Sequence, residues 1–262
     1  MVAGLTRIPQ FGDKVDLFGV GISVTDYDHA TEQIMAAARR HQSFAVSALA
    51  VHGLMEAAED DEFRELVNRI DLVTPDGQPV RWAMNSLHGT RLADRVYGPD
   101  LTWRVIEAAA DDGIGIYLFG STEETGRAFA AEIGRRYPAA EVVGVQADRF
   151  REATADEDAE DIARINDSGA GVVLVGRGCP RQERWVAHHR GRVNAAMLAV
   201  GAAFDYGAGN LSSPPAWMQR FGLQWLYRLG QEPSRLWRRY LVTNSRFVVR
   251  FARALPGRWS GR

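Results

Sequence analysis

Short apolar runs alternate with amphipathic segments along most of the chain. The apolar runs predict strands at 15–24 (a strand or a hairpin), 44–49, 70–73, 114–119, 141–145, 171–175 and 195–204. Between them, apolar residues at helical spacing predict helices at 26–40, 56–68, 78–87, 99–111, 155–168 and 181–190, and one that follows residue 122 to about 136. This alternation predicts an α/β fold with a Rossmann-like parallel sheet, or sheets, covered by helices on both faces.

The pattern changes near residue 213, where a Gly- and Pro-rich loop leads into a segment dense in Trp and Arg. Trp217, Phe221 and Trp225 recur at every fourth position and predict a helix, and Pro233 predicts a junction between two helices near 231–233. We therefore expect an α/β body at 1–213 and a helical C-terminal appendage at 214–262. The body could consist of two lobes, at about 1–112 and 113–213.

Charge follows the same division. Residues 214–262 contain ten Arg, no Lys and one acidic residue, which leaves 21 basic and 32 acidic side chains in residues 1–213. A formal net charge of −2 thus combines an acidic body with a basic appendage, and this indicates an anionic partner or surface for the appendage. The appendage could be a solvated helical face, a nucleic-acid patch or a segment that meets anionic lipid. Arg in place of Lys favours bidentate recognition of phosphate.

The bulk composition sets further limits. A single cysteine, Cys179, excludes an internal disulfide and fits a reducing compartment. The first residues do not follow the pattern of a secretory signal peptide. The longest apolar run, 195–204, is too short to span a bilayer, so we expect any membrane contact to be peripheral.

Three polar or glycine-rich turns follow predicted strands, at 74–77, 120–122 and 176–183. Ligands of open parallel sheets bind beyond the carboxyl ends of the strands, where these turns would lie. Asp76 there could accept a proton from a substrate hydroxyl. Pro-Asp-Gly is also a common turn with Asp as a helix N-cap, and spacing alone favours that interpretation.

The glycine-rich turns are weaker signals. Backbone N–H groups at Gly120-Ser121 and Gly176–Gly178 could hold a phosphate ahead of a helix, although neither turn matches an NAD or Walker motif. Residue types alone predict that Gln182 faces solvent, that Glu183 caps the helix at 181–190, and that Cys179 is a buried structural thiol.

No metal is expected from the residues. Asp-x-Asp patterns at 26–28 and 156–158 fall at predicted helix starts, where acidic side chains interact favourably with the helix dipole. The six His show no metal-ligand spacing.

Five blocks together resemble the WecG/TagA/CpsF family of glycosyltransferases. In order they are DLVTPDGQPVRWA (71–83), RVYGPDL (95–101), VGRGCPRQERWV (175–186), GAAFDYGAG (201–209) and FGLQWLYRLGQEPSRLWRRY (221–240). The resemblance implies transfer of a sugar, usually UDP-linked, onto a lipid-linked saccharide in bacterial surface-polysaccharide assembly, with inversion and without a metal or other cofactor.

The resemblance also implies roles for single residues. Asp76 matches the proposed catalytic base, which reverses the preference from spacing, and Arg95 and Gln182 match active-site polar residues. Many members carry Thr-x-Asn after the second strand, where this chain has SALAVHG (47–53), so Ser47 and His52 are the candidates to line the sugar pocket. The arginines implied to close over the donor diphosphate are Arg228, Arg235 and Arg238.

We therefore expect an inverting transferase that moves a hexose or N-acetylhexosamine-type sugar from a UDP-sugar to a polyprenyl-diphosphate-linked saccharide. It would act at the cytoplasmic face of the membrane, with the appendage on the anionic lipid and with a homo-oligomer left open. Two alternatives stay open: a nucleotide-sugar dehydrogenase or epimerase, for which Gly19-Val20-Gly21 is a poor fingerprint, and a non-catalytic anion-binding module. The acidic body argues against nucleic acid as the partner.

Overall fold

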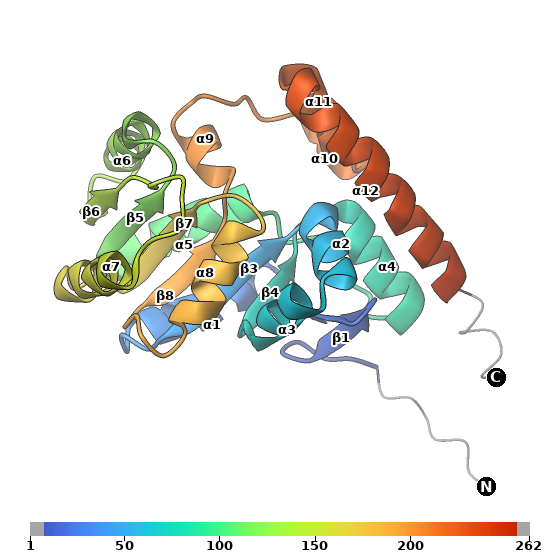
Figure 1. The fold of residues 1–262 in the computed structure, drawn as a ribbon, viewed down its shortest axis with the longest axis horizontal. Helices are drawn as coiled ribbons and strands as arrows, with labels where there is room; N and C mark the ends of the chain where they lie inside the picture. The colour runs from blue at the N-terminus through green and yellow to red at the C-terminus, as the bar shows by residue number, and fades with distance from the viewer. Residues whose placement is uncertain (1–7, 256–262) are drawn as a thin grey trace, which may run out of the picture.

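Six parallel strands form the central sheet of the molecule (Figure 1). The computed structural model describes residues 8–255, apart from the side chains of Ala216, Gln219, Arg235 and Arg239. The strand order is β4-β3-β8-β7-β5-β6. Their bounds are β3 (Phe44–Leu49), β4 (Leu72–Pro75), β5 (Ile116–Gly120), β6 (Val142–Gln146), β7 (Val172–Gly176) and β8 (Ala196–Ala199). The predicted α/β class with a parallel sheet is confirmed.

The first apolar run forms the hairpin that was one of its two predicted outcomes. Strands β1 (Lys14–Leu17) and β2 (Val20–Ser23) pair antiparallel as a separate small sheet. In the main sheet β3 pairs with β8, so strands from both halves of the body share one sheet. The two lobes that we considered, at about 1–112 and 113–213, therefore share one continuous sheet.

Helices cover both faces of this sheet, each over its own buried cluster. One face carries α1 (Tyr27–Ala38), α5 (Gly98–Asp112), α6 (Glu123–Arg136) and the short α9 (Ala203–Gly207). The other carries α2 (Val51–Glu59), α3 (Asp61–Arg69), α7 (Ala155–Asp167) and α8 (Arg181–His189). Helix α4 (Gln78–His88) packs on β4 and β1. The sheet is thus buried on both faces, which explains why its strands read as continuous apolar runs.

Two predicted elements of the body differ from the structure. The helix expected at 56–68 is two helices, because Asp60 leaves helical geometry and its side chain accepts the Phe63 N–H at 3.0 Å to cap α3. The run at 195–204 is a strand only as far as Ala199, and α9 begins at Ala203. Apolar runs alone do not distinguish a buried strand from a short buried helix.

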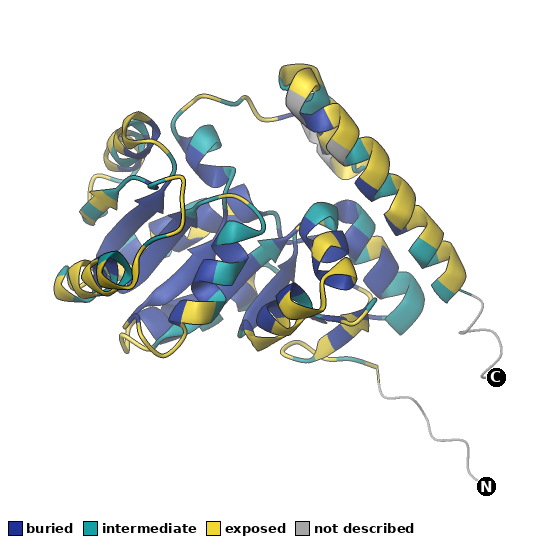
Figure 2. Cartoon of the chain, viewed as in Figure 1, coloured by how far each residue is buried: buried dark blue, intermediate teal, exposed yellow. Residues whose placement is uncertain are grey.

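The appendage consists of α10 (Ala216–Arg220), α11 (Gln224–Gln231) and α12 (Pro233–Ala254), with the predicted junction at Pro233. The helix predicted through Trp217, Phe221 and Trp225 is interrupted by a turn at 221–223, where Gly222 has a φ of +70°. Helix α12 packs along α2, where Arg246 pairs with Glu59 at 2.6 Å (Figure 1). It also reaches the turn between β1 and β2, where Phe247 meets Phe18 edge-on at 5.9 Å. Its opposite side is exposed along its length (Figure 2). Among residues 8–255, no helix is long and apolar enough to cross a bilayer.

The carboxyl ends of the central strands lie in line. Leu49 pairs with Pro75, Val175 with Ala199, and Gly120 with Gly176. All three polar turns therefore lie at the carboxyl end of the parallel sheet, beneath the start of the appendage (Figure 1). Open parallel sheets bind ligands at this end.

Candidate active site

Asp76 stands at the end of β4 and is tied to two other elements. Its N–H donates to the Leu49 carbonyl at 3.3 Å, which links the end of β4 to the end of β3. Its carboxylate Oδ1 accepts from the Gly98 N–H at 3.3 Å, at the first turn of α5. Gly77, not Asp76, is the N-cap of α4. The helix-cap interpretation favoured by spacing is therefore wrong, because the carboxylate turns away from its own helix toward a distant one.

The surroundings of Asp76 change its proton affinity. Burial raises the pKa of the carboxyl from 3.8 to about 6, although the Arg95 guanidinium, the Gly98 N–H and the Arg228 guanidinium all act in the opposite direction. Asp100 adds a smaller increase. Such a carboxyl is mostly ionised at neutral pH yet binds a proton more tightly than an ordinary aspartate. These are the properties of a general base.

Two arginines supply positive charge beside this carboxylate, one from the body and one from the appendage. Arg95 is only 5% exposed, and its guanidinium carbon lies 4.5 Å from the centre of the Tyr97 ring. Arg228 on α11 is partly buried and pairs with Glu232 at 3.2 Å. Both guanidinium groups act on the pKa of Asp76, so residues far apart in the sequence share one site.

Gln182 belongs to a buried polar network at the ends of β7 and β8. Its Oε1 accepts from the Gly178 N–H at 3.1 Å, and its Nε2 donates to Glu183 Oε1 at 2.9 Å. Ser47 on β3 donates to the same Glu183 oxygen at 3.4 Å. Burial raises the pKa of Glu183, opposed by hydrogen bonds from Gln182, Cys179 and Ser47. The expectation of a solvent-facing Gln182 is wrong, since this side chain is only 5% exposed. Glu183 is 1% exposed and also accepts from its own backbone N–H in the first turn of α8, so the structure does not contradict its expected capping role.

Two glycines, Gly98 at the start of α5 and Gly201 after β8, allow close packing around the Asp76 and Gln182 side chains. A Cβ on Gly98 would lie 3.0 Å from the Ala48 side chain and 3.9 Å from both Asp76 Oδ2 and the Val200 carbonyl. A Cβ on Gly201, which has a φ of +42°, would lie 2.8 Å from Gln182 Oε1. Glycine at both positions therefore lets backbone pack close to the Asp76 and Gln182 side chains.

The structure places the remaining candidates of the predicted sugar pocket close by. Ser47 is fully buried within β3, and its hydroxyl donates to Glu183. His52 is in the first turn of α2, half-buried, with Nδ1 3.8 Å from Glu56 Oε1. Their roles toward a sugar stay predictions.

The glycine-rich turns are built for close packing of backbone. Gly120 has a φ of +116°, and a Cβ there would lie 2.7 Å from the Gly176 carbonyl carbon. The Ser121 N–H donates to the Gly176 carbonyl at 2.8 Å, and a Cβ on Gly176 would overlap the Phe204 ring. Gly178 at φ +75° has open space beside it. A phosphate at this turn would therefore have to use groups other than the Ser121 N–H.

The other two appendage arginines are placed less directly. Arg238 is exposed, with its guanidinium 5.4 Å from the centre of the Trp237 ring on α12. The side chain of Arg235 lies outside the described residues. Closure of these two arginines over a diphosphate stays a prediction.

The Asp-x-Asp segments have partners within the protein. Asp26 caps α1 by accepting the His29 N–H at 2.8 Å, and Asp28 pairs with Arg104 at 2.8 Å. Asp158 accepts from His189 at 2.8 Å and pairs with Arg192 at 2.9 Å. In the described part of the chain, no three His, Cys, Asp or Glu side chains gather as a metal site.

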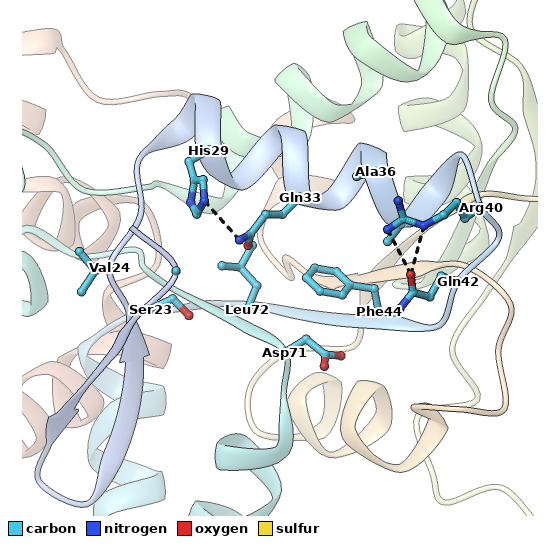
Figure 3. Close-up of a pocket in the computed structure, with 12 residues that line it drawn as sticks. Ser23, Val24, His29, Gln33, Ala36, Arg40, Gln42, Phe44, Asp71 and Leu72 are labelled. Carbon is cyan, nitrogen blue, oxygen red and sulfur yellow. Dashed lines mark hydrogen bonds between the residues drawn. The ribbon is translucent and has the colours of Figure 1, made fainter. Parts of the chain in front are cut away.

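A cavity of about 360 Å³ lies at the opposite, amino end of the strands, between α1 and the starts of β3 and β4 (Figure 3). Its polar groups already bond one another or nearby backbone. Arg40 donates to Gln42, and Asp71 accepts the Ala45 N–H and the Arg190 guanidinium. His29 and Gln33 bond each other at 3.3 Å. This cavity therefore lacks the convergent, perturbed groups found around Asp76.

Local sequence patterns do not single out three contributors to the site. Glu183 holds the Gln182 amide, Gly98 donates to Asp76, and Gln224 of α11 accepts a hydrogen bond from Arg95. The motif blocks 95–101, 175–186 and 221–240 contain all three. Their tertiary partners, however, lie up to 129 residues away.

Comparison with known proteins shows the family of the chain. The model of the family described as "Glycosyl transferase WecG/TagA/CpsF family" matches residues 15–261. A relative from Bacillus subtilis (strain 168), N-acetylglucosaminyldiphosphoundecaprenol N-acetyl-beta-D-mannosaminyltransferase, is 29% identical over 186 residues, which is 71% of this chain and 70% of the relative. The family match runs through the body, the Asp76 turn and the appendage, and the chain belongs to the WecG/TagA/CpsF family and is a glycosyltransferase.

Proposed function

We propose that this enzyme transfers an N-acetylhexosamine-type sugar from a UDP-sugar to a polyprenyl-diphosphate-linked N-acetylglucosamine, with inversion and without a metal, in bacterial cell-surface polysaccharide assembly. One observation carries the proposal. The Asp76 carboxylate, with its pKa raised by burial to about 6, lies at the carboxyl end of the parallel sheet, and the charges of Arg95 and Arg228 act on it. A base and positive charge for a leaving diphosphate are thus within electrostatic reach of each other.

The chemistry follows from these groups. The acceptor hydroxyl gives its proton to Asp76, and its oxygen forms a bond to the anomeric carbon of the donor. The bond from that carbon to the β-phosphate oxygen breaks, and its electron pair leaves with UDP. Attack from the face opposite UDP inverts the anomeric centre.

The arginines have two roles in this scheme. Arg95 and Arg228 stabilise the negative charge that grows on the departing diphosphate. They also lower the pKa of Asp76 in the free enzyme. A bound diphosphate offsets their charge, so the donor raises the proton affinity of Asp76 when an acceptor needs a base.

The acceptor is proposed from the relative, whose name describes transfer of N-acetylmannosamine onto N-acetylglucosaminyldiphosphoundecaprenol. A diphosphate lipid also suits the charge of the appendage. For the donor, we propose a UDP-linked sugar of the N-acetylhexosamine class.

The appendage supports a peripheral position on the inner membrane face. We define its outer face by the exposed apolar residues Trp237, Leu241, Val242, Val248 and Val249 of α12. Leu241 and Val248 are 63% and 60% exposed, and the side of α12 that points away from the body is exposed along its length (Figure 2). Apolar residues flanked by arginine on one helix suit the interface of an anionic bilayer.

The appendage arginines that we expect to meet lipid, because they are not assigned to the diphosphate, are Arg246, Arg250, Arg253, Arg258 and Arg262. Arg246 pairs with Glu59 of the body, and Arg250 is half-buried, whereas Arg253 is exposed. Arg258 and Arg262 lie outside the described residues. The lipid contact is therefore proposed to rest on the apolar outer face more than on a row of arginines. A second copy of the chain on this face is the competing outcome.

The test is transfer with purified protein. UDP-N-acetylhexosamines are supplied with a soluble lipid analogue of N-acetylglucosamine diphosphate, with Asp76→Asn as the matched inactive variant. A product that gains one sugar with inverted configuration supports the proposal. A folded enzyme that modifies none of these acceptors contradicts it.

A further inference from the structure

Gln224 begins α11 and is the point where the appendage enters the site. Its side chain is buried, at 9% exposure, whereas the next two residues, Trp225 and Leu226, are 37% and 46% exposed. Its Oε1 accepts a hydrogen bond from Nη1 of Arg95. Because a guanidinium group only donates, the amide oxygen must be the atom that faces Arg95, and the orientation of the amide is fixed.

A glycine turn sets this contact. Gly222 has a φ of +70°, and a Cβ there would lie 3.1 Å from both the Trp82 ring and Gln78 Cβ. The turn between α10 and α11 therefore rests directly on α4, with no room for a side chain beneath it. Gln224, two residues after Gly222, contacts Arg95. The positive φ and the close approach both require glycine at this position.

Arg95 is held from several sides besides. Its guanidinium lies over the Tyr97 ring, and its backbone N–H donates to Asp94 Oδ1 at 2.8 Å. Gln224 completes this arrangement at the guanidinium end. Among the groups that favour the ionised form of Asp76, Arg95 also has the largest effect. A change in the position of this guanidinium would therefore reach the base directly.

Packing alone does not account for the glutamine. The Gln224 Nε2 is buried without a hydrogen-bond partner in the described part of the chain. An apolar residue would seal the same gap without an unsatisfied donor. What the glutamine adds is the acceptor oxygen on Arg95.

We propose that Gln224 is a positioning residue: its amide oxygen fixes the Arg95 guanidinium beside Asp76 and thereby makes the catalytic arrangement depend on a docked appendage. This inference rests on the proposed function of the same site. It adds a contact between appendage and body that acts through Arg95 rather than through substrate.

The test compares Gln224→Ala, Gln224→Glu and a control. The control is Gln231→Ala, because Gln231 is a glutamine of the same helix whose amide bonds the Ser212 backbone instead. We expect Gln224→Ala to lower kcat/KM about ten- to a hundredfold, as for loss of a hydrogen bond to a charged group. Gln224→Glu keeps an acceptor oxygen and should recover most of this loss.

Two further readouts separate positioning from general packing. The carboxylate introduced by Gln224→Glu would offset the charge of Arg95, so the acid limb of the pH profile should move to higher pH in this variant. In an Arg95→Ala background, Gln224→Ala should cause little further loss, whereas Gln231→Ala should have the same small effect in both backgrounds. Equal kcat/KM for Gln224→Ala and wild type, or additive losses with Arg95→Ala, would overturn the proposal.

A last readout does not depend on sugar transfer. Trypsin cleaves after the arginines of the appendage, and we expect Gln224→Ala to be cleaved there faster than wild type and Gln224→Glu to be cleaved at the wild-type rate. Equal rates for Gln224→Ala and wild type would overturn the docking role even if the transfer reaction proved to be another one. Faster cleavage without any transfer activity would instead contradict the proposed function alone.

Discussion

Asp76→Asn should make the protein more stable and less active at the same time. Asparagine keeps an oxygen for the Gly98 N–H but removes a partly buried charge. The pKa of Asp76 rises from 3.8 to about 6 on folding, and about two pH units correspond to about 3 kcal/mol, so with partial exposure we expect a gain of about 1–3 kcal/mol at pH 7.

The sign follows from proton binding. Between about pH 4 and pH 6 the folded state holds a proton on Asp76 that the unfolded state has lost. The stability of the wild type therefore falls as pH rises through this window, whereas Asp76→Asn lacks this fall. Below about pH 4 the two proteins should be equally stable, because both states of the wild type are then protonated.

Urea unfolding at pH 3.5, 5 and 7 measures this difference, with transfer activity measured on the same preparations. Activity should fall about 100-fold or more. Asp28→Asn is the control, since Asp28 is 89% exposed and makes one ion pair with Arg104, so both its stability and its activity should stay near wild type. An Asp76→Asn protein less stable than wild type at pH 7 would refute the assigned burial cost, and a fully active one would refute the role as base.

Three other predictions test separate parts of the account. In a pH profile, kcat/KM should fall below about pH 6 as Asp76 gains a proton, and Arg228→Gln should move this limb to higher pH because it removes a group that lowers the pKa; an unmoved limb would separate Arg228 from the base. Transfer should continue after dialysis against EDTA, and loss of activity restored by Mg²⁺ or Mn²⁺ would reverse the metal-free mechanism. Leu241→Glu with Val248→Glu should abolish co-sedimentation with anionic vesicles at low salt while Val143→Glu, on an exposed valine of β6, should not; if instead the double variant only converts an oligomer to a monomer, the outer face is a contact between copies.

Local patterns predict most of the elements, and the failures have local causes. Strands buried on both faces and helices with one apolar side follow from periodicity, and Pro233 marks the junction of α11 and α12. The break at Asp60 escapes the pattern because the residues around it keep a helical spacing, while its side chain caps the following helix. The end of β8 escapes it because Ala203 and Phe204 are as buried as the strand before them.

The site is less accessible to local reasoning. Asp76 looks like a turn residue until Gly98 is placed beside its carboxylate, and Gln182 looks exposed until Gly178 and Glu183 are seen to bond its amide. The family motifs identify Asp76, Arg95 and Gln182 without their geometry. Gln224 cannot be found in this way, since its partner is 129 residues away and nothing in its neighbourhood signals a buried amide.

The central claim is that the enzyme transfers a sugar to a lipid-linked diphosphate acceptor and uses Asp76 as the base. The most direct measurement is the intact mass of a polyprenyl-diphosphate-N-acetylglucosamine analogue after incubation with each UDP-N-acetylhexosamine, for wild type and Asp76→Asn in parallel. The account predicts that wild type adds one N-acetylhexosamine from at least one donor and that Asp76→Asn adds none over the same time. An acceptor left unchanged by folded wild type with every donor, or extended equally by both proteins, would contradict it.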